Sequence, residues 1–454
     1  MELYSRTTIW GLEDDEARSV KLSSQPLTLK KLFESNLPIT PARLSSARLS
    51  SASASAVSVV PSSPESPWAL SPLRANPSPS LLYHCIATLH RLDGAIYSIA
   101  ISKGMVFTGS ASRRIRVWRH PECLDRGCIK TSSGHVRVVL AFDTMLFTAH
   151  SDHKIRVWNV SVSDRLRSKK LATLPQRSHL LAFPSRQTRR QHRDVISCLA
   201  YNHAEGLLYS ASWDKTVKTW KVAERRCVDT FVAHDERINA IIVNQEDGFV
   251  FTGSSDASIK IWRRICGELS HSLTMVLRFQ PSPVNALALT TIQGSCFLYS
   301  ASSDGLINFW CKDSMSGRYQ HGGFLQGHRL GVLCLMTLNK LIFSGSEDTT
   351  IRVWSRKEGS SFHVCMAVLE GHRGPVKCLA ACVEIEEVMM AFLVYSVSLD
   401  RMVKVWRIKV LAGNQKMSEG SENSDAQQQI TLDYDMISPV LSPSWIEKRL
   451  QDVS

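Results

Sequence analysis

The sequence predicts an all-β fold made of seven copies of one unit. An eleven-residue ending recurs seven times, as in "SASWDKTVKTW" and "SGSEDTTIRVW". The final tryptophans of these endings are 40, 62, 42, 48, 44 and 52 residues apart. The runs before the endings, such as "GLLYS" and "GFVFT", are rich in β-branched and aromatic residues, so each unit has room for about four short strands. Radial repetition hides the edges of so many strands, and we therefore expect a seven-bladed β-propeller.

Residues 1–80 precede the first unit and do not share its pattern. Positions 41–80 contain 13 serines and 7 prolines. Such a segment cannot bury enough apolar surface to offset its ordering entropy, so we expect a disordered Ser/Pro-rich region over residues 1–80. Its Ser-Pro pairs are candidate sites of proline-directed phosphorylation, and a passive linker is an equally good interpretation. These pairs begin at Ser63, Ser66, Ser71 and Ser78.

The run "LYHCIATLH", residues 82–90, comes directly before the first unit. It is similar to runs expected as outer strands, such as "HVCMAVLEGH". We expect it to become the outer strand of the seventh blade, whose inner strands come from about residues 375–407. This closure joins the two ends of a propeller over residues 81–408 and leaves no open sheet edge.

Histidine, serine or threonine, and aspartate recur together in the units, and these are the residue types of a hydrolase triad. An enzyme does not need five copies of one active site in one chain, so the repetition favours a structural role. With the tryptophan of each ending, the five sets are His135, Thr148, Asp152 and Trp158; His192, Ser210, Asp214 and Trp220; His234, Thr252, Asp256 and Trp262; His328, Ser344, Asp348 and Trp354; and His372, Ser396, Asp400 and Trp406.

Units of the form "GH…[ST]-x-[ST]-x-D-x-x-[IV]-[KR]-x-W" resemble WD repeats, and they cover residues 83–408. The resemblance implies that the aspartate lies in a tight turn and accepts from the histidine. The histidine then bonds the serine or threonine, which in turn reaches the indole N–H. Unit five has Gln280 in the histidine position, and unit one has Leu92 there and Ser112 in place of the aspartate, so we expect these two blades to be softer.

Within the WD family the chain resembles the plant JINGUBANG-like WD-repeat proteins. The similar features are "SWDKTVKTWKV", "LEGHRGPVKCLA", a basic insertion after the second unit and the tail "SPVLSPSWIEKRLQ".

WD propellers look like partner-binding platforms, and the resemblance implies three top-face positions in each blade. One precedes the first apolar residue of the inner strand, one follows it, and one precedes the turn aspartate. In the second unit the first two positions fall on Val138 and Leu140. Exposed aromatic, Arg and Leu side chains on one face have the composition of a binding hot spot. The candidates are Tyr97, Trp213, Arg237, Asn239, Asn285, Glu347, Lys377 and Leu399.

Trp213 stands out among these candidates because every other occupant of its position is smaller. We expect it to anchor a partner peptide or protein. The alternative for Tyr97, Trp213 and Leu399 is that they simply fill the mouth of the ring.

Segment 159–193 lengthens the second gap and carries nine Lys or Arg residues and one Asp. We expect an exposed loop. It is a nuclear-import signal, a dock for acidic partners, or a solvated loop without a role. Nucleic-acid binding is disfavoured because Phe183 is its one aromatic residue and stacking platforms are missing. The candidate import residues are Lys169, Lys170, Arg186, Arg189 and Arg190.

Residues 409–454 are expected to form a mostly disordered tail with a short terminal helix. Trp445, Ile446 and Leu450 have helical spacing, and Ser442-Pro443 resembles a helix start. This helix either docks on the propeller or binds a partner. Ser438 and Ser442 are two further candidate phosphorylation sites.

Bulk composition disfavours several other classes of protein. The 12 cysteines include no C-x-x-C pair, so we expect no metal and no other cofactor. No run reaches 18 apolar residues and the N-terminus lacks a signal pattern, so we expect a soluble protein of the cytoplasm or nucleus with no membrane partner. The net charge of +13 makes an acidic partner conceivable.

No phosphate loop or unrepeated nucleophile set indicates an enzyme. We expect a monomeric, non-catalytic scaffold that binds other proteins in regulation or signalling. One alternative is the substrate receptor of a ubiquitin ligase. Another is a reader of modified peptides such as histone tails, which would need acidic or aromatic-cage residues at the mouth, where Glu347 is one of few acids.

Overall fold

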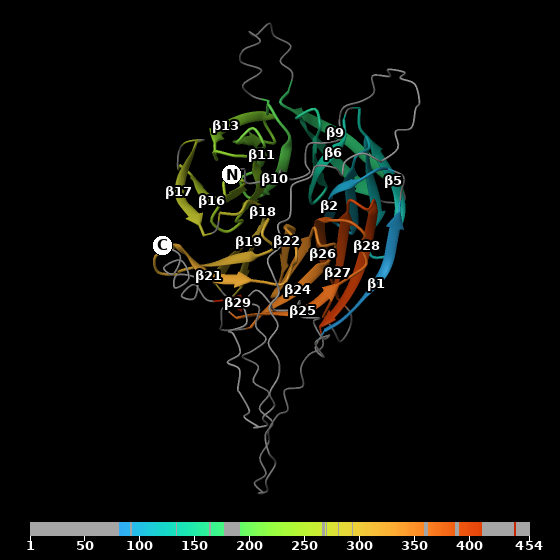
Figure 1. Cartoon of the computed structure of the whole chain (residues 1–454). Helices are drawn as coiled ribbons and strands as arrows, with labels where there is room; N and C mark the ends of the chain where they lie inside the picture. The colour runs from blue at the N-terminus through green and yellow to red at the C-terminus, as the bar shows by residue number, and fades with distance from the viewer. Residues whose placement is uncertain are drawn as a thin grey trace, which may run out of the picture. The chain divides into compact units, whose positions relative to one another are not determined.

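The computed structural model describes residues 81–90, 93–132, 134–162, 165–176, 191–265, 268, 270–279, 281–292, 294–357, 362–385, 390–410 and 440–441 (Figure 1). The chain divides into two units, residues 1–66 and 67–454, and every described residue belongs to the second. The predictions for residues 1–80, for the six Ser-Pro sites, for Arg186, Arg189 and Arg190, and for a helix near residue 445 lie outside the described residues.

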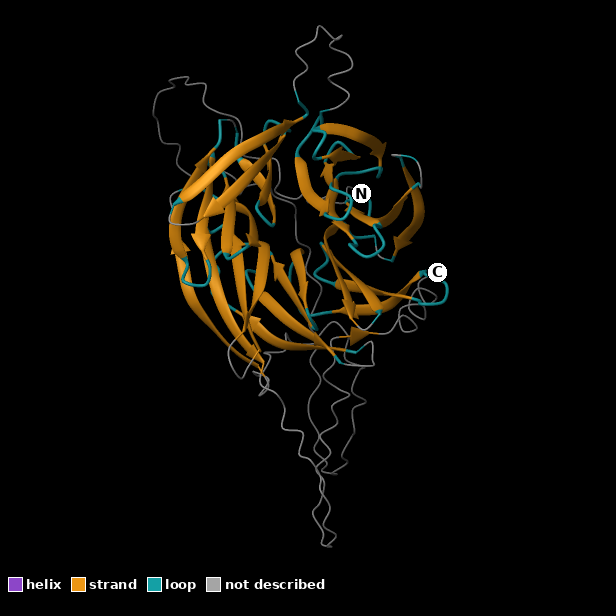
Figure 2. Cartoon of the chain, turned by 180° about the vertical axis from the view of Figure 1, so that it is seen from behind, coloured by secondary structure: helices purple, strands orange, loops and turns teal. Residues whose placement is uncertain are grey.

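Every regular element of the described residues is a β-strand, and seven antiparallel sheets form seven blades (Figure 2). From inner to outer strand, blade 1 is β2 (Ile96–Ser102), β3 (Met105–Ser110), β4 (Arg114–Arg119) and β5 (Leu124–Lys130); blade 2 is β6 (Val136–Phe142), β7 (Met145–His150), β8 (Ile155–Val162) and β9 (Leu166–Leu174); blade 3 is β10 (Ile196–Asn202), β11 (Leu207–Ser212), β12 (Thr216–Lys221) and β13 (Arg226–Val232). Blade 4 is β14 (Ile238–Val243), β15 (Val250–Ser254), β16 (Ser258–Arg264) and β17 (His271–Arg278); blade 5 is β18 (Val284–Ile292), β19 (Ser295–Ser302), β20 (Ile307–Lys312) and β21 (Tyr319–Leu325). Blade 6 is β22 (Val332–Leu338), β23 (Leu341–Ser346), β24 (Ile351–Arg356) and β25 (His363–Leu369); blade 7 is β26 (Val376–Ile385), β27 (Met390–Ser398), β28 (Met402–Val410) and β1 (Leu81–His90). The predicted seven-bladed propeller is confirmed.

The ring closes through the seventh blade, which combines both ends of the repeat region. Strand β1 pairs antiparallel with β28, from Leu81 opposite Val410 to His90 opposite Met402. The inner strands contact one another in order around the ring, and β26 contacts β2. The prediction that the run at 82–90 closes the ring is therefore confirmed.

The core is divided into seven apolar clusters, one at each interface between neighbouring blades. Each cluster receives the repeat tryptophan of one blade; Trp220, for example, packs between blades 2 and 3 and is 1% exposed. A fully buried large apolar side chain contributes about 1.5–3 kcal/mol. Since every tryptophan packs across an interface, the ring is held blade to blade rather than by one central core.

The expectation that the basic segment after the second unit is an exposed loop is wrong for residues 159–162 and 166–174, which form strands, while residues 177–190 lie outside the described part of the chain. The first residues of this segment finish β8, and Leu166–Leu174 form the outer strand β9, where Lys169 lies opposite Asn159 and Lys170 opposite Trp158. Both lysines are exposed. Charged side chains on an edge strand discourage pairing with other chains, which explains how so basic a run can complete a blade.

A short segment near the C-terminus adds a fifth strand to blade 5. Strand β29 (Val440–Leu441) pairs with β21, with Leu441 opposite Phe324 and Val440 opposite Leu325. The described residues contain no helix of the length and apolarity that crossing a bilayer would require.

Candidate functional site

Blade 3 shows how one repeated set of polar residues is connected. The imidazole of His192 contacts Ser210 Oγ through Nε2 at 2.8 Å and Asp214 Oδ2 through Nδ1 at 3.0 Å. The indole Nε1 of Trp220 donates to the same Ser210 Oγ at 2.9 Å. An ionised aspartate can only accept, so Nδ1–H donates to it, and Nε2 accepts from the serine hydroxyl. We call each such set of four residues a tetrad.

Blades 4, 6 and 7 repeat this geometry almost without change. Their histidines contact the hydroxyl at 2.8 Å and the aspartate at 2.8–2.9 Å, and the indole donates at 2.9 Å; the sets are His234, Thr252, Asp256 and Trp262; His328, Ser344, Asp348 and Trp354; and His372, Ser396, Asp400 and Trp406. The hydroxyl-bearing residues Ser210, Thr252, Ser344 and Ser396 are 0% exposed. A nucleophile that no substrate can reach does not make a hydrolase, so the geometry of these four tetrads suits packing rather than chemistry.

Burial and hydrogen bonds together set the protonation state of the tetrad in blade 3. Desolvation lowers the pKa of His192 below its ordinary value, more than the hydrogen bond to Asp214 raises it. Burial alone would raise the pKa of Asp214, but hydrogen bonds from His192, Thr216 and the backbone of Arg193 hold that pKa well below the usual range. The pair is therefore a neutral imidazole beside a carboxylate. The pKa values of His328 and His372 are lowered for the same reason.

Blade 2 is built differently, and the prediction that His135 completes its tetrad is wrong. The histidine on Thr148 is His150, whose Nε2 lies 2.8 Å from Thr148 Oγ1, while Trp158 donates to that hydroxyl at 3.0 Å. His150 is two residues beyond Thr148 on β7 and shares its face of the strand. Asp152 accepts two hydrogen bonds from Arg156, at 2.6 and 3.1 Å.

The structure explains where His135 goes instead. In blades 3, 4, 6 and 7 the tetrad histidine stands four residues before the first residue of the inner strand, whereas His135 directly precedes Val136. It is therefore three residues too late for the tetrad, and its backbone carbonyl accepts from Ser151 N at the top face.

Blades 1 and 5 have their own turn chemistry. In blade 1 the hydroxyls of Ser110 and Ser112 lie 3.0 Å apart where other blades have the turn aspartate, and Trp118 Nε1 donates to Thr108 at the long distance of 3.5 Å. In blade 5 Asp304 accepts from the Leu306 N–H at 2.9 Å. Leu92 and Gln280 lie outside the described residues, and the lower stability of these blades remains a prediction.

A backbone hydrogen bond repeated in all seven blades builds the top face. The residue before the turn donates its N–H to the carbonyl of the residue before the inner strand, at 2.8–3.1 Å. The donors are Ala111, Ser151, Trp213, Ser255, Ser303, Glu347 and Leu399, and the acceptors are Ala95, His135, Val195, Arg237, Pro283, Gly331 and Pro375. In blade 2 the acceptor is thus His135, so the assignment of Val138 to this position is wrong.

Every inner strand has a β-bulge directly after its first residue. Because the inner strands surround the centre of the ring, the extra residue of each bulge lies near the central opening at the top face, which we call the mouth. These bulged residues are Tyr97, Arg137, Ser197, Asn239, Asn285, Leu333 and Lys377. In blade 2 the bulge falls between Val136 and Val138, so Arg137 occupies the position assigned to Leu140. The sequence interpretation missed Arg137, although its distance from Val136 matches that of Tyr97 from Ile96.

At the top-face positions, two arginines stack on aromatic rings of a neighbouring blade. The guanidinium carbon of Arg237 lies 4.8 Å from the centre of the Trp213 ring, and that of Arg137 lies 4.8 Å from the centre of the Tyr97 ring. Trp213 and Tyr97 are half-buried and Arg237 is exposed. A stacked guanidinium keeps its plane fixed while its N–H groups point outward. The predicted contacts Trp213 and Arg237 are thus brought together as one unit.

The other predicted top-face residues differ in what their side chains contact. The side chains of Asn239 and Asn285 donate to Val284 O and Val332 O of the next blade, both at 3.0 Å, so they tie blades together. Leu399 is 41% exposed, so much of its side chain is open to solvent. Burial lowers the pKa of Lys377 to about 8, although the carboxylate of Glu347 acts in the opposite direction.

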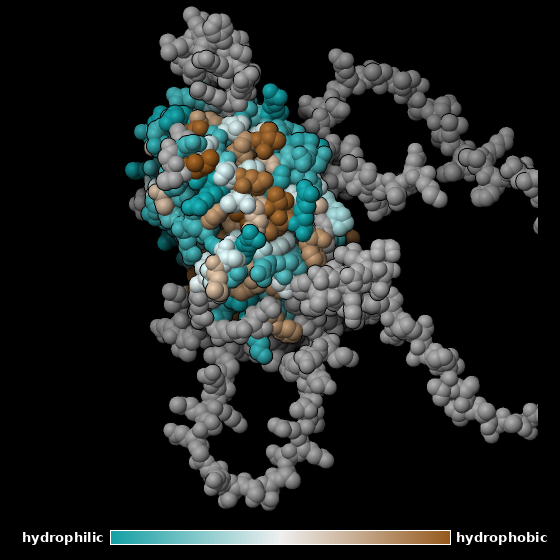
Figure 3. Space-filling view, turned by 90° about the vertical axis from the view of Figure 1, so that its left-hand side faces the viewer, coloured by the Kyte–Doolittle hydropathy of each residue, from teal (hydrophilic) through white to brown (hydrophobic). Residues whose placement is uncertain are grey.

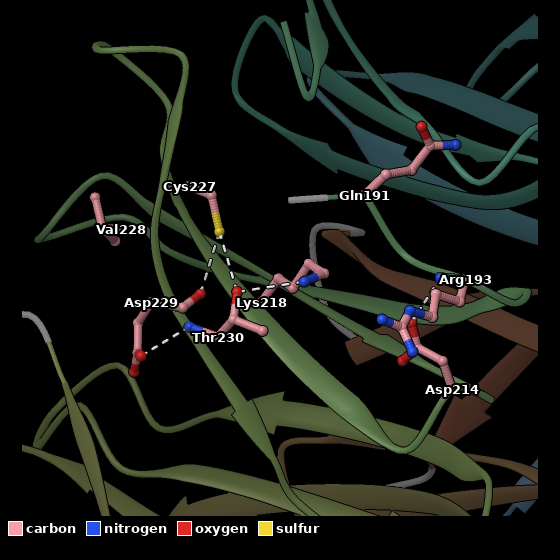
Figure 4. Close-up of a pocket in the computed structure, with 8 residues that line it drawn as sticks. All are labelled: Gln191, Arg193, Asp214, Lys218, Cys227, Val228, Asp229 and Thr230. Carbon is pink, nitrogen blue, oxygen red and sulfur yellow. Dashed lines mark hydrogen bonds between the residues drawn. The ribbon is translucent and has the colours of Figure 1, made fainter. Parts of the chain in front are cut away.

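The described surface also has a groove on the outer side of blade 3 (Figure 4). Lys218 and Thr230 line it, with Lys218 Nζ 3.3 Å from Thr230 Oγ1, and Arg193 and Asp214 lie at its far end. Its polar groups bond one another and Asp214 already belongs to a tetrad, so the groove is part of the blade framework. Among the described residues no cluster of three or more His, Cys, Asp or Glu is placed to hold a metal ion.

The side of the ring that carries β17 offers no continuous apolar face. Apolar and hydrophilic side chains are interspersed there (Figure 3). The exposed apolar residues of β17 are Leu273 and Val276, at 46% and 41% exposure. Isolated apolar side chains of this kind are normal for a soluble surface.

Five segments of the chain match the family model described as WD domain, G-beta repeat: residues 126–159, 184–221, 225–263, 320–355 and 363–407. They end at or just beyond the repeat tryptophans of blades 2, 3, 4, 6 and 7, the blades in which the structure shows a histidine on the buried hydroxyl. The matches support assignment of the repeats to the WD40 family.

Two relatives are similar over part of the chain. Transducin beta-like protein 3 of Rattus norvegicus is 27% identical over 139 residues, which cover 29% of this chain and 17% of the relative. Ribosome biogenesis protein ytm1 of Aspergillus oryzae is 27% identical over 164 residues, which cover 29% of this chain and 31% of the relative. The chain thus spans less than a third of the length of these relatives.

Proposed function

Because five of the seven blades match the WD40 repeat, we propose that this chain is a non-catalytic scaffold that binds partner proteins on the top face of its propeller. The observation that carries the proposal is the stacked pair of Trp213 and Arg237. Trp and Arg are the residue types most enriched at the energetic centres of interfaces. Trp213 is also the largest occupant of its position, which holds Ala, Ser, Glu or Leu in the other blades.

The framework of the blades leaves the top face as the variable surface. The tetrads are buried and nearly identical, so they cannot distinguish one partner from another. The residues at the top-face positions vary around the ring, and the seven bulged positions, for example, hold six residue types. This variation gives the surface its own identity. Function in repeat proteins resides on such surfaces rather than in the fold.

Affinity purification with wild-type and Trp213→Ala protein tests the proposal. A matched control is Leu124→Ala, because Leu124 is 54% exposed and begins β5 at the opposite face of the ring. We expect the Trp213 variant to lose partners that the Leu124 variant keeps, with both melting temperatures close to wild type. A Trp213 variant that unfolds at a much lower temperature and keeps its partners would contradict the proposal.

The captured partners also separate the alternatives. Ubiquitin-ligase subunits would indicate a substrate receptor, and histone tails would indicate a peptide reader. A role in ribosome biogenesis is a further candidate, supported by the name of the Aspergillus relative. Co-sedimentation with ribosomal precursor particles would test it, and a chain found in fractions free of such particles would argue against it.

The finer assignments belong to the same proposal. The similarity to JINGUBANG-like proteins supports a plant regulatory or signalling scaffold acting as a monomer in the cytoplasm or nucleus. Lys169 and Lys170 are exposed on β9, and with the arginines at 186, 189 and 190 they form the candidate import signal. Imaging a tagged protein with these residues replaced by Ala tests import, and an unchanged distribution would remove the idea.

A further inference from the structure

The top face is not uniformly charged, because basic side chains gather on four consecutive blades. Two arginines directly follow the tetrad histidines of blades 6 and 7, two lie in the turns after β3 and β27, and two basic residues occupy bulges at the mouth. We call them the basic arc: Arg329, Arg373, Arg401, Arg113, Arg137 and Lys377. The four turn and loop arginines are exposed, and the two bulged residues are half-buried.

Most acidic groups of the same four blades are already engaged at these positions. Asp93 pairs with Arg116 at 2.6 Å, and Asp152 pairs with Arg156 at 2.6 Å. The aspartates of the two tetrads accept from their histidines. Glu347 lies near enough to Lys377 to stabilise its charge. Glu370 is exposed three residues before Arg373 and offsets part of the charge of the arc. The arc therefore keeps a large excess of positive charge.

Blades 3 and 4 provide an internal comparison. In the loops before their inner strands and in the turn after β11, these two blades carry Arg193, Lys215 and Arg237, which are matched in number by Asp194, Asp235 and Glu236. Lys215 lies 3.7 Å from Glu236. The excess on blades 6, 7, 1 and 2 is thus a local feature and not a general consequence of the basic composition.

Apolar side chains stand between the cations of the arc. Leu330 directly follows Arg329 and is 52% exposed, and Leu399 lies two residues before Arg401 and is 41% exposed. Both belong to the few large apolar side chains that the described surface leaves open. A ligand that carries only charge would gain nothing from them, whereas a ligand with both carboxylates and apolar side chains would cover both kinds of group.

The guanidinium of Arg137 is preorganised to bind an anion within this arc. Its guanidinium is held over the Tyr97 ring at 4.8 Å, which restricts its orientation before any ligand arrives. Its Nε is buried and has no hydrogen-bond partner in the described part of the chain.

We infer that the basic arc binds an acidic protein segment that also carries leucine-type apolar side chains. The carboxylates contact the arginines of blades 6, 7, 1 and 2, and the apolar side chains cover Leu330 and Leu399. This inference names the partner class for the platform proposed above and rests on that proposal. Single-stranded nucleic acid fits less well, because it brings phosphates but needs open aromatic faces to stack on, and Arg137 covers one face of Tyr97.

The test uses the full chain and a labelled synthetic peptide in which Asp and Glu alternate with Leu. The arc variant is Arg373→Glu with Arg401→Glu, and the control is Lys169→Glu with Lys170→Glu, which changes the net charge equally on an exposed outer strand. We expect fluorescence anisotropy to show binding that the arc variant weakens about tenfold or more, that the control leaves nearly unchanged, and that added salt weakens. Circular dichroism establishes that both variants fold.

Two further ligands decide the class of partner. An acidic peptide with Ser in place of Leu, and a single-stranded RNA of equal charge, should both bind more weakly than the Leu peptide, and Leu399→Ser should remove the difference between the two peptides. Equal binding of RNA, or equal loss in both charge variants, would overturn the inference in favour of a general polyanion surface. Cellular partners that depend on Trp213 but not on the arc would also overturn it, while leaving the platform itself intact.

Discussion

The guanidinium of Arg237 in blade 4 covers the indole ring of Trp213 in blade 3, with 4.8 Å between the guanidinium carbon and the ring centre. The two residues also occupy top-face positions, where Trp213 N donates to Val195 O and Ser255 N donates to Arg237 O. The stack therefore joins two blades and holds a cation at the surface in a fixed orientation.

The stack predicts that arginine and lysine are not equivalent at position 237. Arg237→Lys keeps the charge but loses the planar guanidinium over the indole, so partners that need Trp213 should bind several-fold more weakly, by about 0.5–1 kcal/mol. Titration of a purified partner against both proteins checks this. Equal affinity would show that the charge alone matters at this position.

In blade 2 the buried hydroxyl is bonded by His150 and not by His135, so substitutions of these two histidines should differ in how much they destabilise the fold. His150→Ala leaves the Thr148 hydroxyl without its imidazole partner in a buried site, so the free energy of unfolding should fall by about 1–3 kcal/mol. His135→Ala, at a partly exposed top-face position, should change it by less than about 0.5 kcal/mol. Chemical denaturation of both variants measures the difference, and a larger loss for His135 would restore the original assignment.

The tetrad histidines predict that acid destabilises the propeller before the carboxylates titrate. Burial lowers the pKa values of His192, His328 and His372. Below about pH 6.5 these histidines therefore bind protons in the unfolded chain while they stay neutral in the native one. The free energy of unfolding should then fall with decreasing pH, by up to about 1.4 kcal/mol per pH unit for each histidine. Urea unfolding at several pH values measures this slope, and a stability that is flat between about pH 7 and 5 would contradict it.

The tetrad aspartates act in a lower pH window. Hydrogen bonds hold the native pKa of Asp214 below its unfolded value of about 4, so their stabilisation is present above that pH and is lost as the pH falls further. His192→Asn should reduce the slope near pH 6 and also part of the Asp214 contribution below pH 4, because His192 is one of the donors that lower the pKa of Asp214. The contributions of Asp256, Asp348 and Asp400 should remain.

Ring closure predicts different outcomes for two deletions. Removal of residues 1–80 keeps β1, whereas removal of residues 1–90 exposes the backbone edge of β28 and the side of Trp406, which is 3% exposed in the closed ring. We expect the longer deletion to aggregate or melt at a much lower temperature than the shorter one. Size-exclusion chromatography and thermal melting check this, and two equally stable products would show that β1 is dispensable.

The repeated parts of this fold are those that the sequence predicts best. The spacing of the tryptophans indicates seven blades, and the run at 82–90 is recognisable as a closing strand by its likeness to other outer strands. Strand β9 is missed because its lysines hide the apolar pattern of an edge strand that faces solvent. His135 is misassigned although the signal is present, since it stands one residue before its strand and not four.

The contacts between blades lie beyond such sequence reasoning. The stacks of Arg237 on Trp213 and of Arg137 on Tyr97 join neighbouring blades and depend on how those blades pack. The repeat pattern places each residue on the top face but says nothing of which side chain covers which. The basic arc is likewise recognised only when the equivalent positions of four neighbouring blades are compared in their order around the ring.

The most direct measurement of top-face function compares the partners captured by wild-type, Trp213→Ala and Leu124→Ala proteins, with melting temperatures recorded for all three. We predict that the Trp213 variant melts close to wild type and loses specific partners that the Leu124 variant retains. Retention of every partner by a folded Trp213 variant, or equal losses in both variants, would contradict binding at the top face.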